Sequence, residues 1–297
     1  RAALSLLLAV VDPETGVVPN HGPNDGALVH PVALAPYRDF RPVITAACAS
    51  FGHPLPRDVP PSAEALAWLG LPTPGRGEPR PDAVSRGSSG WAAARLGGGA
   101  VSVFVRAGSY TSRPGQIDPL HLDVRFGSRE VVTDAGTFSY NAPPPWRNAL
   151  AVGAVHNGPI LDDEEPGIRG PRFLWYVWPS ARIVSAGMDG DDAVIVAEIP
   201  DRVRRTVRVM ADRVIVQDQV LAPSARRVRI RWLLHPDADP ASVRVEGGSH
   251  LLEAREGEPA GWFSPTYGER VASRYVELER EVKAREVIVT EIRSKTF

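Results

Sequence analysis

The chain has 297 residues, 43% of them hydrophobic, which is enough to bury a core in one large domain or two ordinary ones. Its formal net charge of −1 gives no reason to expect nucleic acid or an anionic membrane as a partner. The single cysteine, Cys48, excludes an internal disulfide and a metal site built on several thiolates. The apolar run at residues 2–11 falls short of the about 20 residues that cross a bilayer, so it predicts a buried helix and no transmembrane segment.

The first seventy residues have a helical pattern. Apolar residues at helical spacing predict a helix over residues 36–50, which Gly52 ends, and Ser62 is placed to cap a short helix over residues 62–69. Proline and glycine are dense over residues 72–90. We therefore expect a helical unit over residues 1–70 and a linker over residues 71–99.

From residue 100 onward, short β-rich runs follow one another without helices between them. Residues 227–232 alternate arginine with apolar side chains, which places the two kinds on opposite faces of a sheet. This texture predicts an antiparallel β-sandwich over residues 100–297 and an α+β multidomain fold class. The predicted strands are residues 101–105, 120–126, 130–134, 173–178, 193–199, 205–210, 213–220, 226–234, 275–279 and 286–290.

Chemically informative side chains are densest over residues 115–161. Gln116 and Asp118 precede His121 there, an Asp-Ala-Gly-Thr-Phe turn starts at Asp134, and a His-Asn pair stands at residues 156–157. This order resembles the central signature of the heparinase II/III family, in which a strand with an acidic residue leads to an Asp-x-Gly-Thr-[Tyr/Phe] turn, a Trp and a His-Asn pair. Residues 22–26 and 37–42 resemble the end of the same family's helical toroid.

The resemblance implies the end of an (α/α) toroid followed by a large antiparallel β-sandwich. It implies a polysaccharide lyase that cleaves an acidic, uronate-containing glycan by β-elimination, in the periplasm or outside the cell. Such an elimination needs a group that neutralises the C6 carboxylate, a base for the C5 proton and an acid for the departing oxygen. The toroid's catalytic Asn or His and its Tyr are expected upstream of residue 1.

The sequence departs from the family at one motif. Relatives with lyase activity carry His-x-His, a catalytic histidine and a zinc ligand, where this chain has Pro114 and Gln116. Only Asp134 and His156 match the remaining zinc positions, and Asp118 is the third donor in reach along the sequence. Two ligands seldom hold zinc, so we expect no firmly bound metal.

The resemblance implies site roles for several residues, and each has a structural alternative. His156 is the candidate for proton transfer or carboxylate neutralisation, with Asn157 beside it and His121 as a substitute acid-base group. A loop pair at 156–157, a sheet-face or solvent-facing His121 and a turn-capping Asp134 are the alternatives. Sugar-positioning roles fall to Gln116, Asp118, Tyr140, Trp146 and Arg147; Trp146 is expected to be exposed for stacking or to fill a gap between the domains.

Two other functions stay open at the level of sequence. A non-catalytic carbohydrate-binding or assembly module on the same sandwich is favoured by the loss of the His-x-His pair. A glycoside hydrolase would use Asp118 and Asp134 as paired carboxyl groups.

Overall fold

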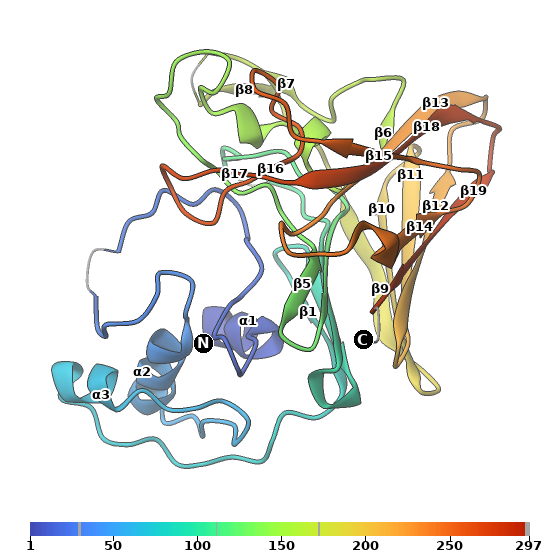
Figure 1. The fold of residues 1–297 in the computed structure, drawn as a ribbon. Helices are drawn as coiled ribbons and strands as arrows, with labels where there is room; N and C mark the ends of the chain where they lie inside the picture. The colour runs from blue at the N-terminus through green and yellow to red at the C-terminus, as the bar shows by residue number, and fades with distance from the viewer. Residues whose placement is uncertain (29–30, 111, 172, 295–297) are drawn as a thin grey trace.

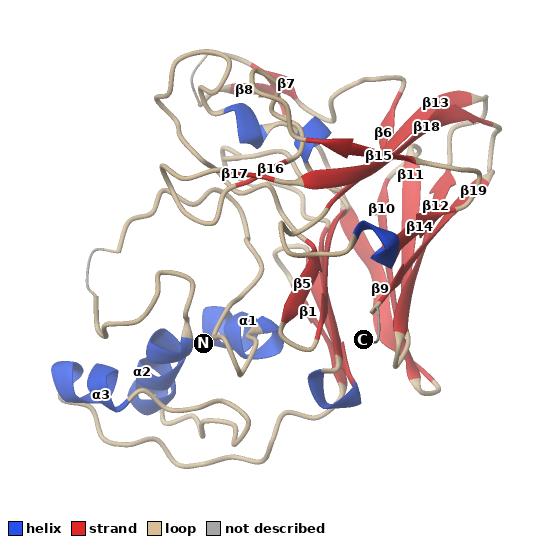
Figure 2. Ribbon diagram, in the orientation of Figure 1, coloured by secondary structure: helices blue, strands red, loops and turns tan. Residues whose placement is uncertain are grey.

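The computed structural model describes residues 1–28, 31–110, 112–171 and 173–294. Three short helices, α1 (Ala2–Val10), α2 (Arg41–Phe51) and α3 (Ala63–Leu69), lie on one side of a mostly β molecule (Figures 1 and 2). All three were predicted, but α2 begins at Arg41 instead of residue 36, with Pro42 in its first turn, where proline is tolerated. That these three helices are the end of a toroid stays a prediction.

The helices share a small core. Leu4 and Val11 pack with Ile44 and Cys48, which is buried as the sequence predicted. The end of α1 also reaches the first sheet, where Val10 contacts a cluster with Trp91 and Phe104. The helical segment is therefore packed directly on the β-structure. No described helix is long and apolar enough to cross a membrane.

A five-stranded sheet has the order β1-β2-β3-β4-β5. Its strands are β1 (Ala83–Gly87), β2 (Trp91–Leu96), β3 (Val101–Arg106), β4 (His121–Phe126) and β5 (Arg129–Val132). The first two lie inside the stretch predicted as a linker. Sequence reasoning missed them because β2 is rich in alanine rather than β-branched residues, and burial rather than β-propensity determines it.

Two further sheets face or adjoin the first. A six-stranded sheet, β14-β19-β12-β11-β10-β9, contains β9 (Arg182–Asp189), β10 (Asp192–Ile199), β11 (Val203–Val209), β12 (Arg213–Val220), β14 (Val243–Val245) and β19 (Val287–Arg293). A four-stranded sheet, β15-β18-β13-β6, contains β6 (Ile160–Leu161), β13 (Arg226–Leu233), β15 (His250–Glu253) and β18 (Arg274–Val282). Two small hairpins pair β7 (Ile168–Arg169) with β8 (Trp175–Val177) and β16 (Trp262–Phe263) with β17 (Val271–Ala272).

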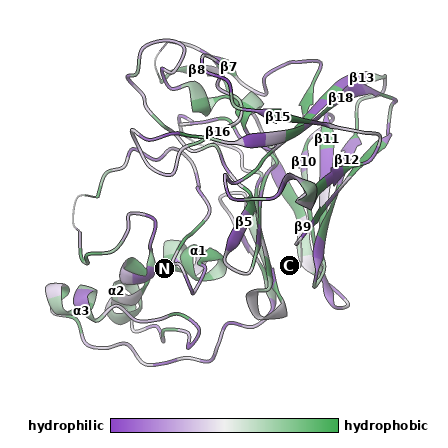
Figure 3. Cartoon of the chain, viewed as in Figure 1, coloured by the Kyte–Doolittle hydropathy of each residue, from purple (hydrophilic) through white to green (hydrophobic). Residues whose placement is uncertain are grey.

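One large apolar core joins these sheets. Val105 and Leu122 from the five-stranded sheet belong to the same buried cluster as Ile195 and Val216 from the six-stranded sheet and Trp232 from the four-stranded one. Apolar and polar residues alternate along the strands that enclose it (Figure 3). The named strands pair antiparallel, which confirms the predicted antiparallel β-architecture.

Candidate functional site

The site lies on the face of the five-stranded sheet that points away from the main core. In β4, Leu122 and Val124 enter that core, so the alternation of the strand turns His121 and Asp123 to the opposite face. Arg106, the last residue of β3, is the cross-strand partner of His121. The loop between these two strands carries Asp118. The site is therefore built where two neighbouring strands meet their connecting loop.

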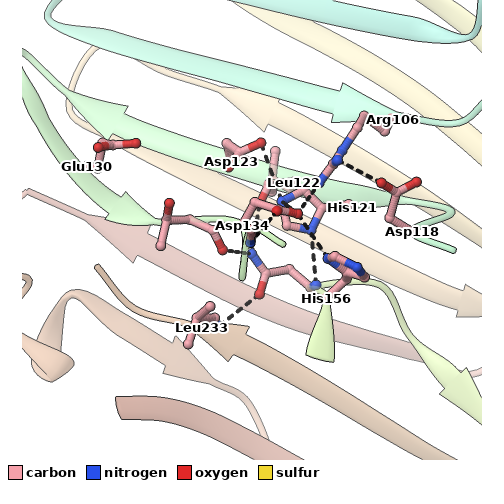
Figure 4. A network of polar contacts seen from close by, with 12 residues as sticks. Arg106, Asp118, His121, Leu122, Asp123, Glu130, Asp134, His156 and Leu233 are labelled. Atoms are coloured by element: carbon pink, nitrogen blue, oxygen red, sulfur yellow. Dashed lines mark hydrogen bonds and ion pairs between the residues drawn. The ribbon is translucent and has the colours of Figure 1, made fainter. Parts of the chain in front are cut away.

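Arg106 joins two carboxylates of the site, and its side chain is 4% exposed (Figure 4). One terminal nitrogen donates to Asp118 Oδ2 at 2.6 Å, and the other donates to Asp134 Oδ2. The Nε of Arg106 is buried and has no hydrogen-bond partner among the described residues. Burial opposes the charge of Arg106, but the two carboxylates raise its pKa above the ordinary value, so it stays a cation.

Asp134 connects Arg106 to two histidines. Its Oδ2 accepts from His156 Nδ1 at 2.9 Å and lies 3.7 Å from His121 Nε2, while its Oδ1 accepts from the backbone N–H of Gly136 at 2.7 Å. The structure thus combines the two expectations for Asp134, because the side chain caps its turn and also joins the site. The residues around it are buried, with His121 0% and His156 1% exposed. The expectation of a solvent-facing His121 is wrong, because its side chain is fully buried beside Asp134 and His156.

Four acidic or histidine side chains in this network have pKa values shifted from their usual range. Burial alone would raise the pKa of Asp134, but Arg106 and His156 hold it well below the ordinary range. The pKa of Asp118 is also lowered, because Arg106 outweighs its burial. Burial raises the pKa of Asp123 well above its usual value, and burial followed by Arg106 lowers that of His121. Asp118 and Asp134 are therefore anions, whereas His121 is neutral and Asp123 favours its protonated form.

His121, Asp134 and His156 form a buried group that could hold a metal, because one ligand atom from each lies within 4.8 Å of the others. His121 thus stands where the sequence pointed to Asp118 as a third donor; Asp118 is instead bound by Arg106. The hydrogen bonds oppose metal at two positions. His121 Nδ1 accepts from the backbone N–H of Asn157 at 3.2 Å, so its proton is on Nε2, and Asp134 Oδ2 already binds Arg106. His156 Nε2 is the remaining donor atom, because it is buried without a hydrogen-bond partner among the described residues and the ring's proton is on Nδ1, which donates to Asp134.

Asn157 connects β4, the segment that follows β5, and β13. Its side-chain amide donates to the carbonyls of Leu122 and Thr133, at 3.1 and 2.9 Å, and its oxygen accepts from the backbone N–H of Leu233 at 2.8 Å. With 0% exposure, this side chain fixes the position of the adjacent His156.

Gln116 and Asp118 lie in the loop before β4, which begins at His121. Their side chains nevertheless converge, because the Gln116 amide donates to Asp118 Oδ2 at 2.6 Å. Tyr110 donates toward Asp118 Oδ1 at 3.1 Å and the Gln116 carbonyl at 2.8 Å. Gln116 and Asp118 are therefore two loop side chains that meet at Asp118 Oδ2, which Arg106 also binds.

An open pocket with an empty volume of about 1020 Å³ adjoins this loop. Its wall includes His21, Arg106, Tyr110, Gln116 and Asp118. Sequence reasoning missed the first three. His21 lies edge-on to Phe104 at 5.6 Å between ring centroids, and burial followed by Arg106 lowers its pKa, so its imidazole is neutral near pH 7. The valine alternation of β3 was the one available signal, since it turns Arg106 away from the core.

The predicted sugar-positioning residues divide into two groups. Tyr140 and Arg147 line a second pocket, of about 1200 Å³, together with Arg169 and Phe173. Trp146 is 8% exposed, with the guanidinium of Arg270 3.7 Å from its ring centroid. The expectation of an exposed Trp146 is wrong, because a cation and neighbouring aromatic rings cover it.

Comparison with known proteins agrees with this architecture. The family model described as "Heparinase II/III-like, C-terminal" matches residues 78–292, more than half of the chain, so the chain belongs to that family. The heparan sulfate lyase HepC from Pedobacter heparinus aligns with a TM-score of 0.68 and 14% identity, over 98% of this chain and 45% of that one. A crystal structure of heparinase III aligns with a TM-score of 0.67 and 13% identity, over 98% and 47%. No curated protein sequence matches the chain.

These comparisons confirm the resemblance found in the sequence. At such low identity the structural likeness shows the fold alone, and the chain spans less than half the length of either relative. The chemistry of the site itself argues against the glycoside hydrolase alternative. Asp118 and Asp134 both have lowered pKa values and both bind Arg106, so neither can serve as the protonated acid that a glycoside hydrolase needs.

Proposed function

We propose that this chain is the C-terminal part of a polysaccharide lyase that cleaves an acidic, uronate-containing glycan by β-elimination. The observation that carries the proposal is a permanently charged Arg106, held by Asp118 and Asp134, in the wall of an open pocket that also contains His21 and Tyr110. A base for the C5 proton and an acid for the departing oxygen are two of the groups that such an elimination needs, and His21 and Tyr110 stand in one pocket. Family membership supports the same reaction class.

In this proposal the pocket residues have separate roles in the two proton transfers. His21, neutral because its pKa is lowered, accepts the C5 proton. Burial, followed by the charge of Asp118, raises the pKa of Tyr110, so its hydroxyl keeps a proton to donate to the departing glycosidic oxygen. Gln116 and Arg106 line the same pocket, but Asp118 and Asp134 already bind Arg106 and offset its charge. The base and the acid of the elimination then each have a side chain in one pocket.

His156, His121 and Asn157 take positioning roles in this scheme. Their side chains are at most 1% exposed and do not line the pocket. His156 holds Asp134 and through it Arg106, while the backbone N–H of Asn157 binds His121 Nδ1. A zinc ion, if bound by His121, Asp134 and His156, would supply further positive charge beneath the pocket. The proposed proton transfers do not depend on it. A periplasmic or secreted location is part of the same proposal, through the family.

The test is the ultraviolet absorbance of the unsaturated uronate product, measured with the complete protein on a panel of uronate polysaccharides. His21→Ala and Tyr110→Phe should each lower kcat about a hundredfold or more, because general acid-base groups contribute on that scale. His53→Ala, on an exposed residue away from the pocket, is the matched control and should retain the rate. Full activity in both pocket variants would rule out the assigned roles.

A non-catalytic carbohydrate-binding module is the second candidate. It is favoured by Gln116 at the position of a family histidine and by the burial of His121 and His156. Binding of the glycans without any unsaturated product would establish this alternative.

A further inference from the structure

The second pocket has an unusual charge. Its lining residues are Tyr140, Asn141, Arg147, Asn148, Arg169, Gly170 and Phe173. Two of these are arginines and none is acidic. Arg147 is exposed and Arg169 is half-buried, so an incoming group can reach both.

Several arginines on the strands of the sandwich are paired with carboxylates. Arg182 and Arg204 share Glu198, at 2.6 and 2.7 Å, and Arg208 binds Asp189 and Asp192. Within the described residues, neither pocket arginine has a carboxylate in ion-pair range. Arg169 instead lies over Trp175 at 5.9 Å and donates to the Arg147 carbonyl at 3.4 Å.

Arg169 is thus a partly desolvated cation without a counter-ion. Burial lowers its pKa, which is the direction expected where water is removed and no anion replaces it. An anionic group bound between the two guanidiniums would offset the free-energy cost of keeping Arg169 charged where water is removed. Guanidinium forks match carboxylate and sulfate oxygens in geometry.

The aromatic wall gives the pocket a preference for a ring. Tyr140 lies edge-on to Phe173 at 5.2 Å, and Phe173 is 38% exposed. Arg113 lies over the Phe173 ring at 5.2 Å and adds a third cation beside the pocket. Apolar ring faces next to Asn141 and arginine donors suit a sugar, which has apolar C–H faces and polar edges.

One loop connects this pocket with the first one. Arg113 contacts Phe173 of the second pocket, while its neighbour Ser112 lines the first, together with Gly115 and Gln116. The two pockets are therefore neighbours along one surface, as two consecutive subsites of a chain polymer would be.

We propose that Arg147 and Arg169 form an anion-recognition subsite, with Tyr140 and Phe173 as its walls, for the carboxylate or sulfate of an acidic sugar unit near the one that binds beside Arg106. The choice of a glycan as ligand rests on the proposed function. The subsite makes binding depend on the charge of a sugar unit away from the pocket that holds His21 and Tyr110.

The experiment measures binding of three oligosaccharides to the complete protein by titration calorimetry: one from alginate, one from heparin, and the alginate oligosaccharide after reduction of its carboxyl groups. Arg147→Gln/Arg169→Gln should weaken binding of an acidic oligosaccharide about tenfold or more, since each charge-assisted pair contributes strongly to affinity. Loss with alginate identifies a carboxylate, and loss with heparin alone identifies a sulfate. Affinity for the reduced oligosaccharide should stay within about twofold.

Arg208→Gln removes one positive charge from an exposed hairpin and is the matched control, with an expected change below about twofold. If the double variant does not fold, Arg147→Gln alone, at an exposed position, should weaken acidic binding about threefold. Unchanged acidic affinity, or equal loss for the reduced oligosaccharide, overturns the subsite. If the wild type gives no unsaturated product but the double variant still loses acidic binding, the lyase proposal fails and the subsite stands.

Discussion

Two buried arginines in this molecule differ in how completely their guanidinium nitrogens are hydrogen-bonded. Arg205, on β11, is 0% exposed; it binds both oxygens of Asp218 at 2.7 Å, donates to the carbonyls of Leu120 and Asn157, and lies 4.8 Å from the Trp232 ring. Arg106 also binds carboxylates, but its Nε has no hydrogen-bond partner among the described residues. The same holds for His121 Nε2 and His156 Nε2 nearby. A fully satisfied buried ion pair serves the fold, whereas unsatisfied buried groups beside a pocket indicate a site.

The largest effect expected from this comparison is on stability. Arg205→Met should lower the free energy of unfolding by about 3–5 kcal/mol, because Asp218 would stay buried without a partner. Urea denaturation of the purified chain measures it. Arg208→Met, which breaks an exposed ion pair, should cost about 0–1 kcal/mol. Similar losses in the two variants would contradict the structural role of Arg205.

A smaller effect concerns Asp123 and depends on pH. Its folded-state pKa is raised, so its contribution to stability is fully present below the unfolded pKa of about 3.9 and is lost as the pH rises through the folded pKa. Asp123→Asn should therefore be more stable than the wild type at neutral pH, by about 1–3 kcal/mol, with the difference disappearing near pH 4. Denaturation curves across that range test the sign. A difference that grows toward acid would mean that Asp123 is ionised in the fold.

The smallest expected effect is that of zinc. Because Arg106 binds Asp134 and the Asn157 N–H faces His121 Nδ1, stoichiometric zinc should stabilise chelator-treated protein by less than about 1 kcal/mol. Thermal unfolding with and without the ion measures this. A larger shift that His156→Ala removes would show that the three side chains do bind metal and that Arg106 moves aside.

The sequence predicted the elements whose pattern is local. Strand β13 alternates arginine with apolar residues and was predicted within one residue of its ends, whereas β9, with Ser, Ala and Gly in its centre, was missed because it has neither strict alternation nor a β-branched run. The helices were found through their apolar spacing and the cap at Ser62.

The site shows the same division. Asp134 and His156 were candidates because a motif named them, and His121 because it follows Asp118 closely in the sequence; the structure brings the three together. Arg106 and His21 belong to no motif, and they reach the site only because β3 pairs with β4 and the segment before α2 crosses the sheet. Contacts between segments 12 to about 100 residues apart are set by tertiary packing, which one sequence does not reveal.

The loop from Ser112 to Asp118 has a consequence for the products. It borders both pockets, so the separation between Arg106 and the Arg147–Arg169 pair is fixed by a segment that Arg106 itself holds through Asp118. If a glycan occupies both pockets, this fixed separation sets the number of sugar units that lie between them. Under the proposed function, cleavage would fall at a fixed distance from the sugar unit that the Arg147–Arg169 pair binds, and a change in the length of this loop would change that distance.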